Sequence, residues 1–299
     1  MDVLLKRSAF YAVRCRRYTA ARMSASASAV DVTPELSVVI VAWRAREDVL
    51  RCLASLEQYA DVPYEVIVVD DGSGDGTEES VAARFPTVAL VAKQENEGLV
   101  RGRNSALPLV RGRYVLMLDA DTEVRSGAIG AMLAALKSPG VGLVGPKLLY
   151  EDGTLQLSCR RWPPFLVPFL RRGPLARLGE PELHRRHLMM DFDHASERPV
   201  VWVIGAAQMW RSDLPDRIGR YDTRVSSYGG EDLDWCLRVW EAGMEVRYAP
   251  QSEVTHRWQQ LTRQSPFGRQ SFRALRDWYY LQWKHRRLRG SLRLQEANA

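Results

Sequence analysis

Cysteine is scarce in this sequence, and long apolar runs are missing from it. The four cysteines are scattered without C-x-x-C spacing; they are Cys15, Cys52, Cys159 and Cys236. This distribution argues against a zinc site or a disulfide framework, and it fits a reducing, cytoplasmic compartment. No window approaches the ~20 apolar residues that a membrane-spanning helix needs. We therefore expect a cytoplasmic protein whose contact with the cell membrane would be peripheral, at its inner face.

Acidic residues are almost missing from the first part of the chain. Up to Val30 the only acidic residue is Asp2, whereas basic and serine residues are frequent. Such a composition predicts a disordered basic tail over residues 1–34. The same composition also fits a transit peptide, and translation could begin at Met23 instead. The sequence leaves these three interpretations open.

The remaining composition is that of a globular protein, with 46% hydrophobic and 26% charged residues. The formal net charge of +6 indicates an anionic partner, such as a nucleotide, a membrane surface or a lipid phosphate. No DNA- or RNA-binding motif accompanies this charge, so we expect no nucleic-acid partner.

Short apolar runs rich in β-branched residues recur along the first half of the chain. They cover residues 36–42, 64–69, 88–92 and 114–118. Segments with the apolar spacing of helices, including 48–56 and 98–110, separate these runs. Strands that alternate with helices predict an α/β fold with a Rossmann-like, mostly parallel central sheet flanked by helices. Ligands bind such sheets at the carboxyl ends of the strands.

The second half continues with a helix, further strands and another helix. We expect the helices over 127–137 and 228–238, and the strands over 141–147, 153–157 and 200–205. Residues 160–198 are rich in proline, arginine and histidine and predict no regular element, as in a functional or mobile segment.

Two carboxylates follow the predicted strand 114–118, in the run Asp119-Ala120-Asp121. A strand cannot bury two neighbouring carboxylates without a counter-charge. Oxygen ligands of this kind suit Mg²⁺ or Mn²⁺, and such a metal could hold a diphosphate. The alternative is a polar turn that ends the strand and caps the next helix.

A second acidic turn, Asp70-Asp71-Gly72-Ser73-Gly74, follows the second predicted strand. It resembles a dinucleotide fingerprint but lacks the third glycine, because Thr77 stands there. An acidic side chain at this position suits hydrogen bonds from a nucleobase or ribose, and a capped turn is the structural alternative.

Glu231 and Asp232 lie in the first turn of a predicted helix, where the helix dipole favours acids. One of them could instead act as a general base toward an attacking hydroxyl. His256 could be a metal ligand, a core histidine or a surface residue.

Basic and aromatic residues alternate from Arg257 to the end of the chain. A helix with this pattern could lie in a membrane interface, or it could pack on the domain with a solvated basic face. We therefore treat 259–299 as a basic, aromatic, helical extension.

The order and spacing of these motifs resemble glycosyltransferase family 2, inverting enzymes of the GT-A fold. The matching segments are 37–41, 68–73, 96–99 with Asn104, 118–122, 142–147, 152–153, 204–206, 230–238, 242–243 and 249–250 with His256. Bacterial rhamnosyltransferase-type enzymes of cell-wall or surface polysaccharide assembly are the most similar members. Many of these have Asn-Pro-Asp where this chain has Asp119-Ala120-Asp121.

The resemblance implies a GT-A domain over 35–258, with a nucleotide-sugar-binding half (35–125) and an acceptor-binding half (126–258). It implies Mg²⁺ or Mn²⁺ as cofactor, a dTDP-, UDP- or GDP-linked sugar as donor, and a glycan or polyprenyl-diphosphate-linked acceptor. Asp232 would be the catalytic base, with Glu231 beside it at the acceptor. The metal would lie at Asp119, Asp121 and His256. The nucleotide-sugar would contact Ala42, Trp43, Asp71, Gly72, Ser73, Arg103, Asn104, Asp119 and Ala120.

Two other functions remain to be weighed at this point. A GT-A domain could bind a nucleotide-sugar or polysaccharide without turnover, although the intact Asp121, Asp232 and His256 argue against this. An NAD-type oxidoreductase is suggested only by the glycine-rich turn at 72–74, and its spacing disfavours that function.

Overall fold

The computed structural model describes residues 16–17, 33–165, 182–225, 229–257 and 269–288. The first half contains β1 (Arg16–Arg17), β2 (Leu36–Ala42), α1 (Arg46–Tyr59), β3 (Tyr64–Asp70), α2 (Thr77–Arg84), β4 (Ala89–Ala92), α3 (Leu99–Ala106), a 3₁₀ turn (Leu107–Leu109), β5 (Tyr114–Asp119), β6 (Thr122–Val124) and α4 (Ala128–Leu136). The second half contains β7 (Val141–Leu149), β8 (Leu155–Gln156), β9 (Cys159–Arg160), α6 (Glu182–His187), β10 (Arg198–Pro199), β11 (Trp202–Val203), β12 (Ala207–Arg211), α7 (Leu214–Ile218), α8 (Gly230–Glu241), β13 (Glu245–His256) and α9 (Arg269–Lys284).

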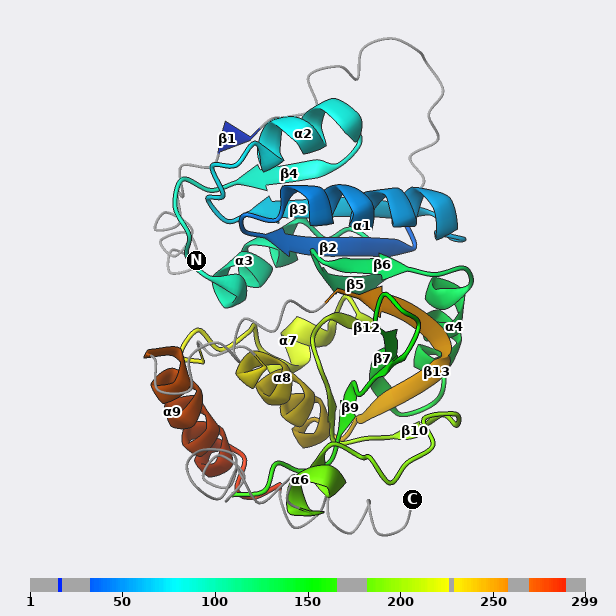
Figure 1. Cartoon of the computed structure of the whole chain (residues 1–299), viewed down its shortest axis with the longest axis vertical. Helices are drawn as coiled ribbons and strands as arrows, with labels where there is room; N and C mark the ends of the chain where they lie inside the picture. The colour runs from blue at the N-terminus through cyan, green and yellow to red at the C-terminus, as the bar shows by residue number, and fades with distance from the viewer. Residues whose placement is uncertain (1–15, 18–32, 166–181, 226–228, 258–268, 289–299) are drawn as a thin grey trace, which may run out of the picture.

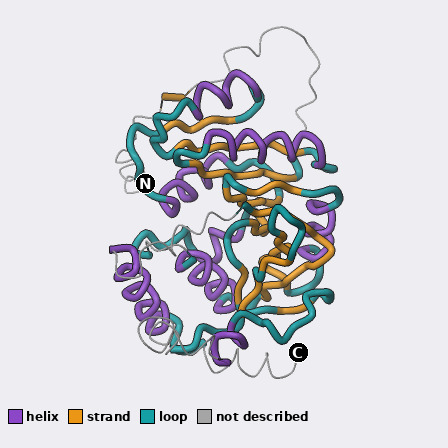
Figure 2. The backbone as a smooth tube through the Cα atoms, in the orientation of Figure 1, coloured by secondary structure: helices purple, strands orange, loops and turns teal. Residues whose placement is uncertain are grey.

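One curled sheet runs through the whole described body (Figures 1 and 2), with the main strand order β1-β4-β3-β2-β5-β12-β7-β13-β10. β4, β3, β2 and β5 pair in parallel, and β7 pairs in parallel with β13. β12 lies antiparallel between β5 and β7, so all six of these parallel strands point the same way. The expected α/β fold with a mostly parallel central sheet is therefore confirmed.

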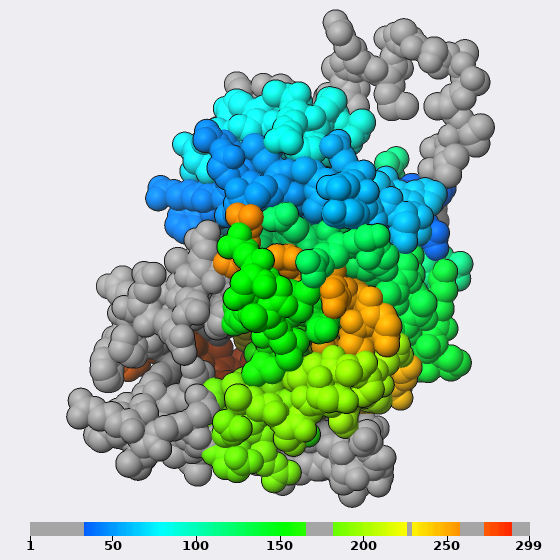
Figure 3. Space-filling model, turned by 45° about the vertical axis from the view of Figure 1, so that its right-hand side comes forward, coloured from blue at the N-terminus to red at the C-terminus, as the bar shows by residue number. Residues whose placement is uncertain are grey.

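Helices cover both faces of this sheet because successive strand residues point to opposite sides. Val38 and Ile40 of β2 pack in the cluster that contains α1, α2 and α4. Val39 and Val41 pack in the opposite cluster, with α3 and α8. The first half of the sequence forms the upper part of the body in Figure 3, and the second half forms the lower part.

The prediction for the middle of the second half was wrong in two respects. Residues 200–205 do not continue the main sheet, because β11 pairs with β9 in a separate two-stranded sheet. The strand that enters the main sheet is β12, which the sequence did not indicate because two of its five residues, Gln208 and Arg211, are polar. Gln208 is nevertheless fully buried, and its side-chain amide donates to the Val203 carbonyl at 3.0 Å.

Two segments expected to lack structure contain short regular elements. Within 160–198 the structure has α6 and β10, while 166–181 lies outside the described residues. Within the basic tail, Arg16–Arg17 pairs antiparallel with β4, and the neighbouring 1–15 and 18–32 lie outside the described residues. Among the helices that the structure describes, none has both the length and the apolar character needed to span a membrane.

Candidate active site

The acidic residues of the first candidate site lie at the carboxyl end of β5. Asp119 is the last residue of β5, and Asp121 follows in the turn before β6. β6 pairs with the end of β13 and places His256 opposite Thr122. One ligand atom each from Asp119, Asp121 and His256 lies within 4.8 Å of the others. The structure thus brings together all three residues expected at a metal.

His256 is oriented by a residue that the sequence did not reveal. Its Nδ1 lies 2.7 Å from Oε1 of Gln156 on β8, and this carbonyl oxygen can only accept, so Nδ1 carries the proton. Its Nε2 then faces Asp121 Oδ1 at 3.4 Å. Burial lowers the pKa of His256, but the hydrogen bond and the charge of Asp121 outweigh it and raise the pKa above its ordinary value.

This donor set fits a divalent cation. Two carboxylates and one imidazole nitrogen are suitable ligands for Mn²⁺, and the carboxylates also suit Mg²⁺. Metal-bound histidines in proteins usually donate their other N–H to an oxygen acceptor, as His256 does to Gln156. Burial raises the pKa of Asp119 to about 6, while Arg103 opposes that rise.

The second pair of acids, Glu231 and Asp232, lies in the first turn of α8, and both residues are buried. Asp232 Oδ2 accepts a hydrogen bond from the Gly205 backbone N–H at 2.7 Å. A Cβ atom at Gly205 would overlap the Asp232 carboxylate, so this approach requires glycine. Residues 204–206 therefore hold one oxygen of Asp232 in a fixed place.

Glu231 differs from Asp232 in its contacts. Its Oε2 is buried and has no hydrogen-bond partner among the described residues. Burial and the neighbouring charge of Asp232 raise the pKa of Glu231 to about 8, although Arg103 opposes them. A protonated carboxyl group is therefore favoured at this position near neutral pH.

Arg103 of α3 joins the two acidic groups. Its Nη1 lies 2.8 Å from Asp232 Oδ1, and its Nη2 lies 3.0 Å from Asp119 Oδ1. Nη2 also donates to the Gly205 carbonyl at 3.2 Å, and Nη1 lies 4.0 Å from Glu231 Oε1. Arg103 is only 1% exposed, whereas the Asp119 side chain retains 31% of its exposure. One buried guanidinium thus neutralises carboxylates from the end of β5 and from the start of α8.

Asn104, the next residue of α3, connects the halves in a different way. Its side-chain amide donates to the Tyr221 carbonyl at 2.9 Å and accepts from the Tyr221 N–H at 3.0 Å. The Tyr221 ring stacks on Trp235 of α8, with ring centroids 4.1 Å apart. In the contacts described here, Arg103 and Asn104 therefore bind other residues of the protein. These contacts lie around the site that is expected to hold the donor.

The expected nucleobase pocket lies where β2 and β3 end side by side. The Asp71 N–H donates to the Ala42 carbonyl at 2.8 Å, and Ser73 Oγ accepts from the Arg44 N–H at 2.9 Å. Gly72 has φ +73°, and a Cβ there would lie 2.5 Å from the Glu95 backbone carbonyl carbon. The turn therefore depends on glycine for both its conformation and its close packing.

Asp71 is buried by the loop that follows β4. One oxygen accepts from the Gly98 N–H at 2.7 Å, and the other lies 3.0 Å from Lys93 Nζ. Trp43, by contrast, is 48% exposed just after the end of β2, and Ala120 is buried between Asp119 and Asp121. Lys93 was missed from the sequence because it precedes the recognisable Asn96-Glu-Gly segment and carries no motif of its own.

Comparison with known proteins agrees with this arrangement. The family model described as Glycosyl transferase family 2 matches residues 37–191. The chain is 30% identical over 246 residues to N-acetylglucosaminyl-diphospho-decaprenol L-rhamnosyltransferase of Mycobacterium tuberculosis, covering 75% of this chain and 76% of that relative.

Two solved structures have the same fold. Mannosyltransferase PcManGT of Pyrobaculum calidifontis, in complex with GDP-Man and Mn²⁺, gives a TM-score of 0.54 at 20% identity, covering 77% of this chain and 59% of that one. GalNAc-T7 with UDP, GalNAc and Mn²⁺ gives 0.61 at 17% identity, covering 84% and 48%. The chain thus spans about half to three fifths of these structures, and the shared fold is GT-A. On the strength of the family model and the mycobacterial relative, the chain belongs to glycosyl transferase family 2 and is a glycosyltransferase.

Proposed function

We propose that this glycosyltransferase uses a divalent metal and inverts the anomeric configuration of the sugar that it transfers. The observation that carries the proposal is the convergence of two carboxylate groups on Arg103. Asp119 approaches the guanidinium from the end of β5, and Asp232 approaches it from the start of α8. An inverting displacement at an anomeric carbon needs a general base at the nucleophile and positive charge at the leaving diphosphate. Asp232 would be that base, and Asp119 would help to hold the metal that supplies the charge.

The donor side would hold the nucleoside diphosphate. Asp119, Asp121 and His256 would bind Mg²⁺ or Mn²⁺, which when bound supplies Lewis-acid stabilisation of the charge that grows on the leaving phosphate. Gln156 would keep His256 in the tautomer whose Nε2 is turned to this site. Ala42, Trp43, Asp71, Gly72 and Ser73 would surround the nucleobase and ribose.

The acceptor side would activate the attacking hydroxyl. Asp232 would be the general base, oriented by the Gly205 N–H and by Arg103. Removal of a general base typically lowers the rate by ~10²–10⁴. Glu231, whose Oε2 has no partner among the described residues, would contact the acceptor hydroxyl or orient it.

The named relative indicates the class of substrates. Its name gives L-rhamnose as the sugar and a polyprenyl diphosphate carrying N-acetylglucosamine as the acceptor. For this chain we propose a dTDP-, UDP- or GDP-linked sugar as donor and a glycan or polyprenyl-diphosphate-linked acceptor, with a role in cell-wall or surface polysaccharide synthesis. We also propose that 35–125 binds the donor and that 126–258 binds the acceptor.

Donor hydrolysis tests this proposal without knowledge of the acceptor. The purified protein is incubated with Mn²⁺ or Mg²⁺ and each of dTDP-rhamnose, UDP-glucose, UDP-galactose and GDP-mannose, and the released nucleoside diphosphate is measured. We expect release from one donor only, its loss with chelator, and its loss in Asp121→Asn. Asp213→Asn serves as the control, because Asp213 is an exposed acid at the start of α7.

Two outcomes would contradict the proposal. Release that continues at the wild-type rate in chelator, or in Asp121→Asn, would remove the metal from the mechanism. When a donor has been identified, the configuration of the transferred sugar is read by NMR of the product made with a model acceptor. A product that retains the donor configuration would exclude the inverting assignment.

A further inference from the structure

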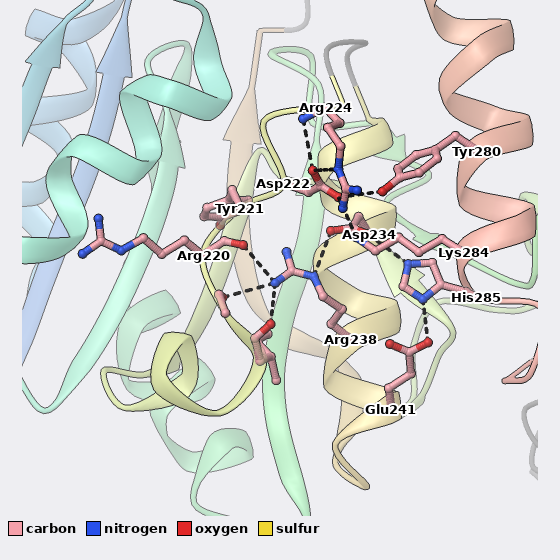
Figure 4. A network of polar contacts seen from close by, with 12 residues as sticks. Arg220, Tyr221, Asp222, Arg224, Asp234, Arg238, Glu241, Tyr280, Lys284 and His285 are labelled. Carbon is pink, nitrogen blue, oxygen red and sulfur yellow. Dashed lines mark hydrogen bonds and ion pairs between the residues drawn. The ribbon is translucent and has the colours of Figure 1, made fainter. Parts of the chain in front are cut away.

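The C-terminal helix α9 has one face docked on the catalytic domain and one face turned to solvent. Its inner face contacts α8 and the turn before it through a network of charged groups (Figure 4). Lys284 Nζ lies 2.5 Å from Asp234 Oδ1 and 2.8 Å from Asp222 Oδ2. His285 Nε2 lies 2.9 Å from Asp234 Oδ1, and the Tyr280 hydroxyl donates to Asp222 at 3.0 Å. The sequence left open whether this helix packs on the domain or lies in a membrane interface. The structure shows that it packs on the domain.

This docking fixes α9 relative to the candidate site. Asp234 lies one turn or less from Glu231 and Asp232 on α8, and it faces α9 while they face Arg103. Figure 1 shows α9 beside α8 at the outer side of the lower half. Any surface that binds the outer face of α9 is thereby held at a set position relative to the acceptor-side acids.

The outer face of α9 is aromatic and basic. Phe272 is 68% exposed and Trp283 is 63% exposed, the two highest values among the large hydrophobic residues that the structure describes. They stand eleven positions apart, about three helical turns, and so lie on one side of the helix about 16 Å apart. Isolated apolar residues on a surface are ordinary, so these two rings indicate a binding surface only in combination with the charges around them.

Charge on this face has one sign. Exposed basic residues flank the two aromatic residues; they are Arg273, Arg286 and Arg287, whereas the exposed Arg276 is paired with Asp277. From 269 to 288 the only acidic residue is Asp277, which is buried on the inner face. The Arg286 guanidinium lies over the Trp283 ring, 5.0 Å from its centroid. The inner face of α9 thus has carboxylate partners, whereas among the described residues no carboxylate pairs with Arg273, Arg286 or Arg287 of the outer face.

We propose that the outer face of α9, defined by Phe272, Arg273, Trp283, Arg286 and Arg287, is a docking surface for an anionic lipid bilayer. Tryptophan and phenylalanine bury in the headgroup region while arginines contact lipid phosphates, and each basic residue adds to the attraction. This inference rests on the proposed function in one respect, because a polyprenyl-linked acceptor would lie in the same bilayer. The docked inner face would then hold α8 and its acids at a fixed position relative to that bilayer.

Vesicle co-sedimentation of the full chain tests the docking surface. The vesicles contain phosphatidylcholine with or without phosphatidylglycerol, and the variants are Phe272→Ala/Trp283→Ala and Arg286→Gln/Arg287→Gln. Wild type should bind only the anionic vesicles, and less at high salt. The arginine pair should weaken partitioning about 30-fold. Arg111→Gln/Arg125→Gln has the same net charge, alters two surface arginines of the first half, and should bind more tightly than the α9 arginine variant.

Three results would overturn the proposal: no binding of wild type to anionic vesicles, wild-type binding by both α9 variants, or equal loss in the Arg111/Arg125 control. Analytical ultracentrifugation distinguishes another occupant, because a dimer abolished by Phe272→Ala/Trp283→Ala would assign this face to a second copy of the chain. Donor hydrolysis in solution is run on the same samples and should not change in any variant. Failure of hydrolysis with intact vesicle binding would count against the proposed function and leave the docking surface standing.

Discussion

Replacing Arg103 with methionine should destabilise the fold strongly and not only abolish activity. Methionine has a comparable length but no charge, so the variant leaves Asp119 and Asp232 without their shared cation. A buried ion pair is not in itself strong evidence for stability, because desolvation offsets the attraction. Breaking one by removing a single partner, however, costs about 3–5 kcal/mol, since a buried charge is then left unpaired.

Two comparisons separate the stability lost through the unpaired carboxylates from the stability lost by replacing any arginine. Arg125 pairs with Glu253 at 3.3 Å, and both side chains are well exposed, at 48% and 38%. Arg125→Met should therefore change the free energy of unfolding by about 1 kcal/mol or less. Arg103→Met/Asp232→Asn removes one of the two carboxylate charges that the single variant leaves unpaired, so part of the lost stability should return.

Urea unfolding followed by tryptophan fluorescence and circular dichroism gives the stability of each variant. Arg103→Lys is informative as well, because an ammonium keeps the charge but lacks the fork that contacts two carboxylates at once. It should recover part of the stability and little of the activity. If Arg103→Met is as stable as Arg125→Met, then Arg103 is not the internal counter-ion that its contacts indicate.

Three further predictions follow from the same site. Gly205→Ala should abolish donor turnover in a folded protein, because its Cβ would overlap the Asp232 carboxylate; wild-type turnover would contradict the contact. Gln156→Leu should weaken the apparent affinity for Mn²⁺ about 10–100-fold, measured from the Mn²⁺ dependence of donor hydrolysis, because His256 loses its orienting acceptor. The folded-state pKa of Glu231 is raised from 4.5 to about 8, so its protonated form contributes stability below pH 4.5 that is lost as the pH rises through 8. The free energy of unfolding of Glu231→Gln, relative to wild type, should therefore increase between pH 5 and pH 8 in urea titrations, and a constant difference would contradict the raised pKa.

The sequence was most informative where local pattern and burial agree. The runs 36–42, 64–69 and 114–118 are apolar and β-branched because each strand is covered on both faces, and the structure forms β2, β3 and β5 there. The acidic turns after β3 and β5 could be placed at one edge for the same reason, since parallel strands end together. The prediction of a main-sheet strand over residues 200–205 failed because apolar character fits any buried extended segment, and periodicity does not say which sheet that segment joins.

The sequence could not predict that Arg103 and Asn104 both bind residues from the second half of the chain. Both residues stand in α3 beside the Asn96-Glu-Gly segment, so the sequence associates them with the donor. Their partners Asp232 and Tyr221 lie 129 and 117 positions further along the chain, a separation that leaves no trace in local spacing. A site with several carboxylates in one buried region needs a counter-charge before any ligand arrives. The sequence shows the acids that create this need, but only the folded chain shows that an arginine of α3 meets it both for Asp119 at the end of β5 and for Asp232 of α8.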